Sequence, residues 1–300
     1  MIKRIFFMSS LLIFSLFCLA QNFSAADYQI YSAAGAKYTL AEMTAELAEY
    51  DVIFFGEWHD DLLLHQIEAE ILPLLSSQRD LAISLEMFER DVQPVLDKFL
   101  SAEISETEFL KNSRPWGNYL ADYKPLVDFA VHNELDVIAA NVPRRYAAAV
   151  HKKGPEALDT LPKAEQKFVA RKLQILDNKY KEKFLQTISG HMNAGNAMGS
   201  KMRLENIYAA QCLKDDTMAE SIVDYLLDNP QKQLIHYNGN FHSEEFLGTA
   251  NRVKLLQPEL KIAVITPVVV SLESLKNFDK TKADLGTFLI FAPRYIDSDK

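Results

Sequence analysis

The chain contains four short apolar runs, and each is followed directly by polar residues with useful chemistry. The runs span residues 51–55, 81–85, 136–140 and 233–237. Short continuous apolar stretches are typical of strands that are buried on both faces of a parallel sheet. In open parallel sheets, ligands bind beyond the carboxyl ends of the strands. We therefore expect the four polar clusters to form one site from distant parts of the sequence.

Helical periodicity alternates with these strands in the first half of the chain. Leu63, Ile67 and Ile71 recur at helical spacing and predict a helix over residues 62–75, with Pro73 marking its end. A second helix around residues 123–133 leads into the third strand. Strands that alternate with helices imply right-handed crossovers. The predicted fold class is therefore α/β, with a mostly parallel central sheet flanked by helices.

Between the third and fourth strands the pattern predicts helices and no strand. Long helices are expected at residues 164–188 and 201–227, and we interpret residues 145–230 as a helical insertion or cap. After the fourth strand the α/β pattern resumes. It predicts a helix over residues 243–256 and strands over residues 261–265 and 287–291. One domain over residues 27–300 explains this order more economically than two domains do.

Residues 1–26 are interpreted as a secretory signal rather than as part of the fold. Two basic residues precede an apolar stretch over residues 5–20, and small residues suit cleavage after Ala20 or Ala26. A single-span anchor is the alternative, but the stretch is shorter than the ~20 residues that a span prefers. A lipid anchor at Cys18 has weak support, because a bulky residue precedes it. The expected location is exported, either periplasmic or membrane-associated.

Charge and cysteine content narrow the classes of function. The net charge of −9 disfavours general nucleic-acid binding, which needs concentrated Lys and Arg. Cleavage after Cys18 leaves only Cys212, so no intrachain disulfide is expected, and Cys212 is interpreted as a small buried hydrophobe. The sequence has no HExxH, phosphate-binding glycine loop, GxSxG or CxxCH motif. The common zinc proteases, nucleotide hydrolases, serine hydrolases and covalent haem proteins are thereby disfavoured.

Glu57 and His59 form the first cluster that could carry chemistry. They are two residues apart, so in an extended backbone both point to the same side. Such a pair can bind a divalent metal ion or act as a general base. The structural alternative is a salt bridge beside the start of a helix. Glu86 follows the second strand and needs a cation, a metal ion or a place at the exposed rim, because Glu is seldom buried without a partner.

Arg144 and His242 follow the third and fourth of these strands. Arg144 could hold Glu86 or clamp a carboxylate or phosphate, and helix capping or solvent exposure are the alternatives. His242 is predicted at the same sheet edge as His59, which makes it a candidate ligand or acid–base group. His191 lies in a connector rich in Gly, Asn and Met. It is either an ordinary loop histidine or part of a segment that closes on a ligand.

Three aromatic residues precede the third strand at a spacing that places them on one helix face. Trp116, Tyr119 and Tyr123 are explained most simply as a packed seam of the core. The alternative is that they contact a flat hydrophobic ligand, and Tyr can ligate haem iron.

At these residues the chain resembles the haem-binding uptake proteins of the ChaN family. That family shares a superfamily with Tiki metalloproteases, TraB proteins and erythromycin-esterase-like enzymes. The resemblance covers residues 38–267 and rests on short motifs in the right order. The motifs are Gly56-Glu57-Trp58-His59-Asp60, Leu85-Glu86-Met87-Phe88, Asn141-Val142-Pro143-Arg144, Ala210-Gln211 with Asp216-Thr217-Met218-Ala219, and Gly239-Asn240-Phe241-His242.

The resemblance implies an α/β core with a helical portion and a role in bacterial haem or iron uptake. Haem is expected to bind non-covalently with Tyr as axial ligand, with a haem-linked homodimer and an outer-membrane haem receptor system as partners. A Gram-negative type of bacterium is implied. The candidate haem ligands are Tyr119, Tyr123, Tyr208, Tyr237 and His191.

Three functional hypotheses remain at this point. The leading one is an exported haem-binding protein of haem and iron uptake. The superfamily's enzymes place a Glu-x-His pair and a second Glu in the active site, which matches Glu57, His59 and Glu86. The alternative is therefore a metal-dependent hydrolase, in which these residues and His242 hold a divalent ion and Arg144 stabilises developing negative charge. The third is a scaffold whose polar cluster only satisfies buried groups.

Overall fold

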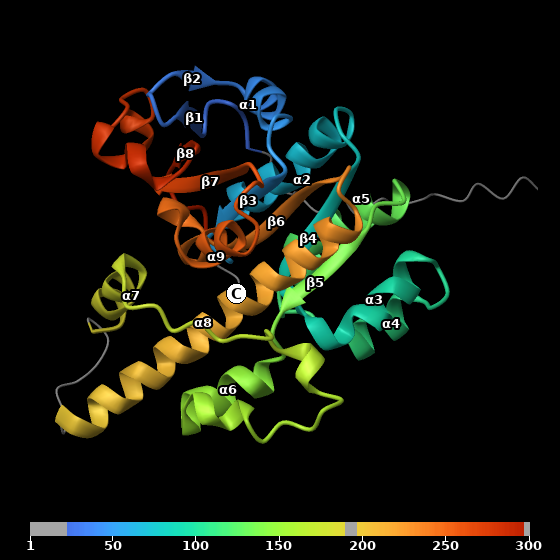
Figure 1. The fold of residues 1–300 in the computed structure, drawn as a ribbon. Helices are drawn as coiled ribbons and strands as arrows, with labels where there is room; N and C mark the ends of the chain where they lie inside the picture. Colours follow the sequence, from blue (N-terminus) through green and yellow to red (C-terminus); the bar gives the residue numbers. More distant parts are fainter. Residues whose placement is uncertain (1–22, 190–196, 297–300) are drawn as a thin grey trace, which may run out of the picture.

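Eight strands form one mostly parallel sheet in a computed structural model that describes residues 23–189 and 197–296. Their order is β2-β1-β8-β7-β3-β6-β4-β5 (Figure 1). The strands from β8 to β5 run parallel to their neighbours, whereas β1 pairs antiparallel with β8 and β2. The predicted α/β fold class is confirmed. The strands are β1 (Gln29–Ser32), β2 (Lys37–Tyr38), β3 (Val52–Glu57), β4 (Leu81–Glu89), β5 (Val137–Asn141), β6 (Gln233–Gly239), β7 (Ile262–Val269) and β8 (Phe288–Ala292).

Helices connect the strands and cover the sheet. The α-helices are α1 (Leu40–Leu47), α2 (Leu62–Ser76), α3 (Gln93–Leu100), α4 (Glu106–Ser113), α5 (Lys124–His132), α6 (Arg144–Lys153), α7 (Lys179–Ser189), α8 (Ala197–Asp228) and α9 (Gly248–Leu256). Shorter turns include the π-helix η2 (Tyr119–Tyr123) and the 3-10 helices η1 (Arg90–Val92), η3 (Pro155–Leu158), η4 (Gln166–Phe168), η5 (Asn240–His242), η6 (Glu244–Phe246), η7 (Leu272–Ser274) and η8 (Lys280–Leu285).

The sheet is covered by helices on both faces. Successive side chains of a strand point to opposite faces. In β3, Ile53 and Phe55 belong to the core formed with α2 and α5. Val52 and Phe54 belong to a second core, formed with α8 and α9. The apolar run that ends at the polar cluster is therefore a central strand, and its carboxyl end is rigidly held.

The region expected to form a helical cap contributes α6, α7 and α8. Figure 1 shows the amino-terminal half of α8 extending past the sheet, with α6 and α7 beside it. The carboxyl-terminal half of α8 packs on the sheet itself, where Ala219 and Ile222 join the second core. α8 thus links the helical region to the strands.

Residues 164–178 differ from the predicted long helix. They contain only η4, and regular helix starts again at α7. Side chains of α8 accept hydrogen bonds from backbone N–H groups of this segment, and a helix would need the same groups for its internal hydrogen bonds. These bonds run from the backbone N–H of Ala170 to Thr217, of Arg171 to Glu220 and of Gln174 to Asp216.

α2 ends within one residue of its predicted boundary and includes Pro73 near that end, where the loss of a single backbone hydrogen bond is tolerated. Two other predicted boundaries differ from the structure. β4 does not end at Glu86 but continues past it, with a register shift against β5. α9 begins at Gly248 rather than at residue 243, because Glu245 and Phe246 adopt left-handed backbone angles that interrupt a helix.

Some predictions concern residues whose structure is not described. The secretory signal up to residue 22, including Cys18, and the histidine at position 191 lie outside the described residues. Within residues 23–189 and 197–296, no helix is long and apolar enough to cross a membrane. Cys212 is fully buried on α8, as predicted.

Candidate functional site

The four strands with polar ends are neighbours in the sheet, in the order β3-β6-β4-β5. Glu57 at the end of β3 pairs in register with Gly239 at the end of β6. The backbone N–H of Gly239 donates to Glu86 Oε2 at 2.8 Å. Because the strands are parallel, their carboxyl ends meet at one edge of the sheet. The expectation that Glu57, Glu86 and the β6 cluster come together is met by this arrangement.

Glu57 and His59 form a hydrogen-bonded pair at this edge. His59 Nδ1 lies 2.7 Å from Glu57 Oε1, and the Tyr123 hydroxyl donates to the same oxygen at 2.6 Å. Burial alone would lower the pKa of His59, but the hydrogen bond to Glu57 and the charges of Glu86 and Glu57 raise it. The His59 side chain is 46% exposed and its ring packs edge-on against Trp116. His59 is thus the solvent-facing imidazole of the site.

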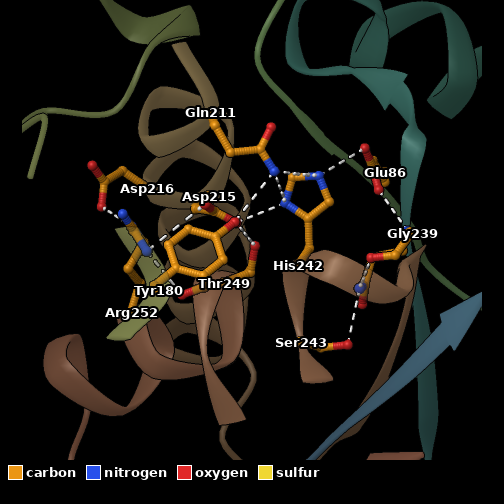
Figure 2. A network of polar contacts seen from close by, with 12 residues as sticks. Glu86, Tyr180, Gln211, Asp215, Asp216, Gly239, His242, Ser243, Thr249 and Arg252 are labelled. Atoms are coloured by element: carbon orange, nitrogen blue, oxygen red, sulfur yellow. Dashed lines mark hydrogen bonds and ion pairs between the residues drawn. The ribbon is translucent and has the colours of Figure 1, made fainter. Parts of the chain in front are cut away.

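His242 lies between two carboxylates. Its Nδ1 is 2.7 Å from Asp215 Oδ1, and its Nε2 is 3.3 Å from Glu86 Oε1 (Figure 2). Thr249 donates a further hydrogen bond to Asp215. Burial opposes charge on His242, but the charges of Glu86 and Asp215 raise its pKa to about 9. The pKa of Glu86 is held far below its usual range, against burial, by the charge and hydrogen bond of His242. His242 is therefore an imidazolium clamped between anions at neutral pH.

A buried arginine lies beneath this histidine. Arg252 is 1% exposed, its Nε donates to Asp216 Oδ1 at 2.7 Å, and its Nη1 lies 3.8 Å from Asp215 Oδ2. Figure 2 shows the chain of contacts from Glu86 through His242 and Asp215 to Arg252. The alternating charges stabilise one another in an interior that would otherwise disfavour each of them.

A cleft of about 700 Å³ is lined in part by Trp116, whose ring packs against His59. Met87 and Trp116 give it apolar walls, and its charged residues are Arg114, Arg144, Arg145 and one carboxylate, Glu89. Arg144 therefore lies in this cleft, and the role of holding Glu86 belongs to His242 and Gly239 instead.

The cleft arginines differ in their partners. Arg114 pairs with Glu89 and Asp91, and Arg145 pairs with Asp91. Among the described residues Arg144 forms no ion pair, and its guanidinium is exposed. Arg144 is thus the cleft cation with the most freedom to meet an anionic ligand.

The predicted haem-ligating tyrosines are all buried. The hydroxyl of Tyr123 donates to Glu57, that of Tyr208 to Leu176 O and that of Tyr237 to Glu68 O, whereas Tyr119 packs in the main core. Burial raises the pKa of each of these phenols. A phenolate, the form that binds iron(III), is therefore disfavoured in this arrangement. Tyr123 lies beside the cleft through its contact with Trp116.

The predicted metal ligands do not come together as one group. Among the described residues, the side chains whose ligand atoms all lie within 4.8 Å of one another are Glu57, His65 and Glu68. Of the four predicted ligands, only Glu57 belongs to this group. The Nδ1 atoms of His59 and His242 are instead directed at Glu57 and Asp215.

Sequence reasoning missed His65, Glu68, Asp215 and Arg252. His65 and Glu68 had a detectable signal, because they are polar residues on the apolar face of α2. Asp215 and Arg252 sit on helices with mixed surfaces, so their burial could not be inferred from periodicity.

The fold and this site define an open α/β protein with a polar site at the carboxyl ends of its parallel strands. The family described as haem-binding uptake, Tiki superfamily, ChaN matches residues 43–253, which is most of the chain. The protein therefore belongs to that family, as the sequence motifs predicted. No curated protein matches the sequence significantly.

A solved structure with the same fold supports this assignment. The structure of ChaN of Campylobacter jejuni with cofacial haem binding has a TM-score of 0.69 and 19% sequence identity. The match covers 89% of this chain and 97% of that one. The type III effector HopBA1 (9% identity, 85% and 94% coverage, TM-score 0.48) and the erythromycin esterase EreC (14%, 79% and 76%, TM-score 0.48) are weaker matches that do not bear on function.

Gly239→Ala is expected to move the His59 ring away from Glu57. An added Cβ would lie 2.9 Å from His59 Cε1 and Nε2, which is too close for both to remain. Because His59 is half exposed, its ring can yield, at a cost of about 1 kcal/mol in folding stability. The pKa of His59, followed by NMR of the imidazole, should fall towards its ordinary value. Gly117→Ala is the control, since its Cβ meets no atom within 4 Å. An unchanged titration in Gly239→Ala would contradict the described geometry.

Proposed function

We propose that the protein is an exported haem-binding protein that takes part in bacterial haem and iron uptake. The observation that carries this proposal is membership of the haem-binding ChaN family across residues 43–253. The fold match to ChaN of Campylobacter jejuni, which binds haem cofacially, supports it over nearly the whole chain. The signal-like residues 1–26 support export. The hydrolase alternative is not favoured, because the family and the better structural match both concern haem.

The cleft beside His59 fits the chemistry of haem. Haem is a flat apolar ring with two carboxylates at one edge. Trp116 and Met87 offer an apolar wall, and Arg144, with its neighbouring arginines, offers charge for the carboxylates. His59, oriented through Nδ1 by Glu57, is an imidazole that contacts the cleft through Trp116. Haem bound here would supply its iron as the electrophilic centre, and these residues would orient the ring and balance its charge.

Two partners follow from the same proposal. A second copy of the chain would share the haem, since cofacial binding brings two haem faces together. An outer-membrane haem receptor system would supply the haem to an exported protein. Periplasmic or membrane-associated location in a Gram-negative type of bacterium is part of the proposal.

Titration of the purified protein with haemin should give a shifted Soret band that saturates at a fixed stoichiometry. Trp116→Ala and Arg144→Ala should each weaken binding about tenfold, roughly 1.4 kcal/mol, because each removes one side of the cleft. Arg171→Ala is the control, as an exposed arginine on a different part of the chain. Substituting His59 by Ala and the four tyrosines by Phe identifies the iron ligand from the change in the visible spectrum.

The same titration, followed by sedimentation, tests the haem-linked dimer. Association should increase with haem occupancy. A spectrum identical to that of free haemin at micromolar protein would refute haem binding. Equal haem affinities of the wild type, Trp116→Ala and Arg144→Ala would show that haem does not bind in this cleft.

A further inference from the structure

Helix α2 carries two ionisable side chains on its buried face. His65 and Glu68 are three residues apart, so they are neighbours on the helix surface, and His65 Nδ1 lies 2.8 Å from Glu68 Oε2. Glu57 reaches the same point from the end of β3, with its Oε2 3.7 Å from His65 Nδ1. All three residues are buried, and Glu68 is 0% exposed. Two carboxylates thus converge on the same ring nitrogen, Nδ1, of a single imidazole.

The hydrogen bond made by the second ring nitrogen of His65, Nε2, fixes the orientation of the ring. His65 Nε2 lies 3.1 Å from the backbone oxygen of His59. A carbonyl oxygen can only accept, so Nε2 carries the hydrogen. The Nδ1 atom therefore faces the two carboxylates. Without a cation between them, its lone pair would oppose the oxygen lone pairs at short range. The arrangement requires a proton between Nδ1 and the carboxylates, carried by the imidazole or by a carboxyl group, or a metal ion at that position.

Two carboxylate oxygens near His65 Nδ1 favour a metal ion over a proton at this position. Glu57 Oε2 and Glu68 Oε1 are buried and have no hydrogen-bond partner among the described residues. A buried acceptor without a partner is costly. A proton on His65 Nδ1 serves one acceptor at 2.8 Å, and satisfying these two oxygens would take a second proton on one of the carboxylates. A metal ion accepts one donor atom from each of the three side chains at once.

We propose that Glu57, His65 and Glu68 bind a divalent transition-metal ion beneath the polar site. Their ligand atoms lie within 4.8 Å of one another, which permits coordination by all three. One imidazole and two carboxylates suit zinc, manganese or iron(II).

The surrounding contacts resemble those of a metal centre. The bond from His65 Nε2 to a backbone carbonyl is the outer contact that metal-binding histidines usually make. Glu57 is held on its other oxygen by Tyr123 and His59. Because His59 is half exposed, Glu57 connects the buried ion to the surface site. The metal proposal does not depend on haem binding, because neither His65 nor Glu68 lines the cleft.

The experiment is metal titration of the full chain after chelation. The protein is treated with EDTA, titrated with zinc or manganese chloride by calorimetry, desalted and analysed for metal by mass spectrometry. The wild type should retain one ion per chain. Glu68→Gln keeps the shape of the side chain but removes its charge, and should weaken binding by about 100-fold or more. Metal should also raise the melting temperature of the wild type and not that of Glu68→Gln.

His242→Gln distinguishes this site from the cluster around Glu86. It should retain the ion with unchanged stoichiometry, because His242 contacts Glu86 and Asp215 instead. Loss of the ion in His242→Gln, with retention in Glu68→Gln, would overturn the proposal, as would a wild type that binds no ion. X-ray absorption of the zinc-loaded wild type is independent of variant folding. It should show one imidazole per zinc, and two would overturn the assignment.

Discussion

Replacing Arg252 by methionine is expected to lower the free energy of unfolding by about 3–5 kcal/mol. Arg252 is buried and directs its charge at Asp216 and Asp215. Its Nη1 also donates to the backbone oxygen of Gly248 at 3.0 Å. Methionine fills most of the volume but leaves Asp216 without its cation and Asp215 with His242 alone. Burial already raises the pKa of Asp216 to about 6, although the charge of Arg252 opposes this shift. Without Arg252, little is left to stabilise the anionic form of Asp216.

Urea unfolding followed by circular dichroism measures this effect. Arg171→Met is the matched control, because Arg171 pairs with Asp224 and Glu220 but is 67% exposed. Exposed ion pairs contribute about 0–1 kcal/mol. If both variants lost the same small amount, the charge network beneath His242 would not support the fold.

The second large effect is a dependence of stability on pH that originates at His242. Its pKa is about 9 in the folded protein and 6.5 when unperturbed. A raised folded pKa means that the stabilisation is complete below pH 6.5 and is lost as the pH rises through 9. The shift corresponds to roughly 3 kcal/mol. Above about pH 10, the wild type and His242→Gln both hold a neutral residue between Glu86 and Asp215.

The measurement compares the free energies of unfolding of the two proteins across this range. The advantage of the wild type over His242→Gln should shrink by about 3 kcal/mol between pH 6.5 and about pH 10. Ionisable groups that do not contact His242 change both proteins equally and cancel in the difference. His151→Gln, at an exposed position on α6, should give no such trend. A difference that is constant with pH would show that His242 is not charged in the folded protein.

The sheet could be predicted because its strands carry their signal locally. Apolar runs such as residues 51–55 are buried on both faces, so the run itself is enough to predict a central strand. The edge at which Glu57 and Glu86 meet then follows from parallel pairing. The helix expected over residues 164–188 begins only at Lys179, because backbone donors before it bond to side chains of α8. No local sequence pattern reveals acceptors that lie so far along the chain.

The sequence predicted which residues belong to the site better than it predicted the hydrogen-bond partner of each residue. His59 and His242 were identified, but what each ring contacts depends on helices that arrive from elsewhere. Asp215 comes from α8 and binds His242, a role that the sequence suggested for no residue. Arg144 was predicted either to hold Glu86 or to clamp a carboxylate or phosphate, and the exposed start of α6 directs it to the cleft and not to Glu86. Proximity in the sheet therefore predicts neighbours, whereas hydrogen-bond partners are set by the packing of helices.

The order of strands also affects how the protein folds. The central strand β3 pairs with β6 and β7, which are synthesised long after it. Contacts between distant parts of a chain form slowly, because the intervening loop must first be closed. Until β6 arrives, Glu57 lacks its paired strand, and Glu86 lacks the backbone donor of Gly239 and the histidine that hold it. A nascent or truncated chain thus has these carboxylates but no site, and an assembled site marks a chain that has completed folding.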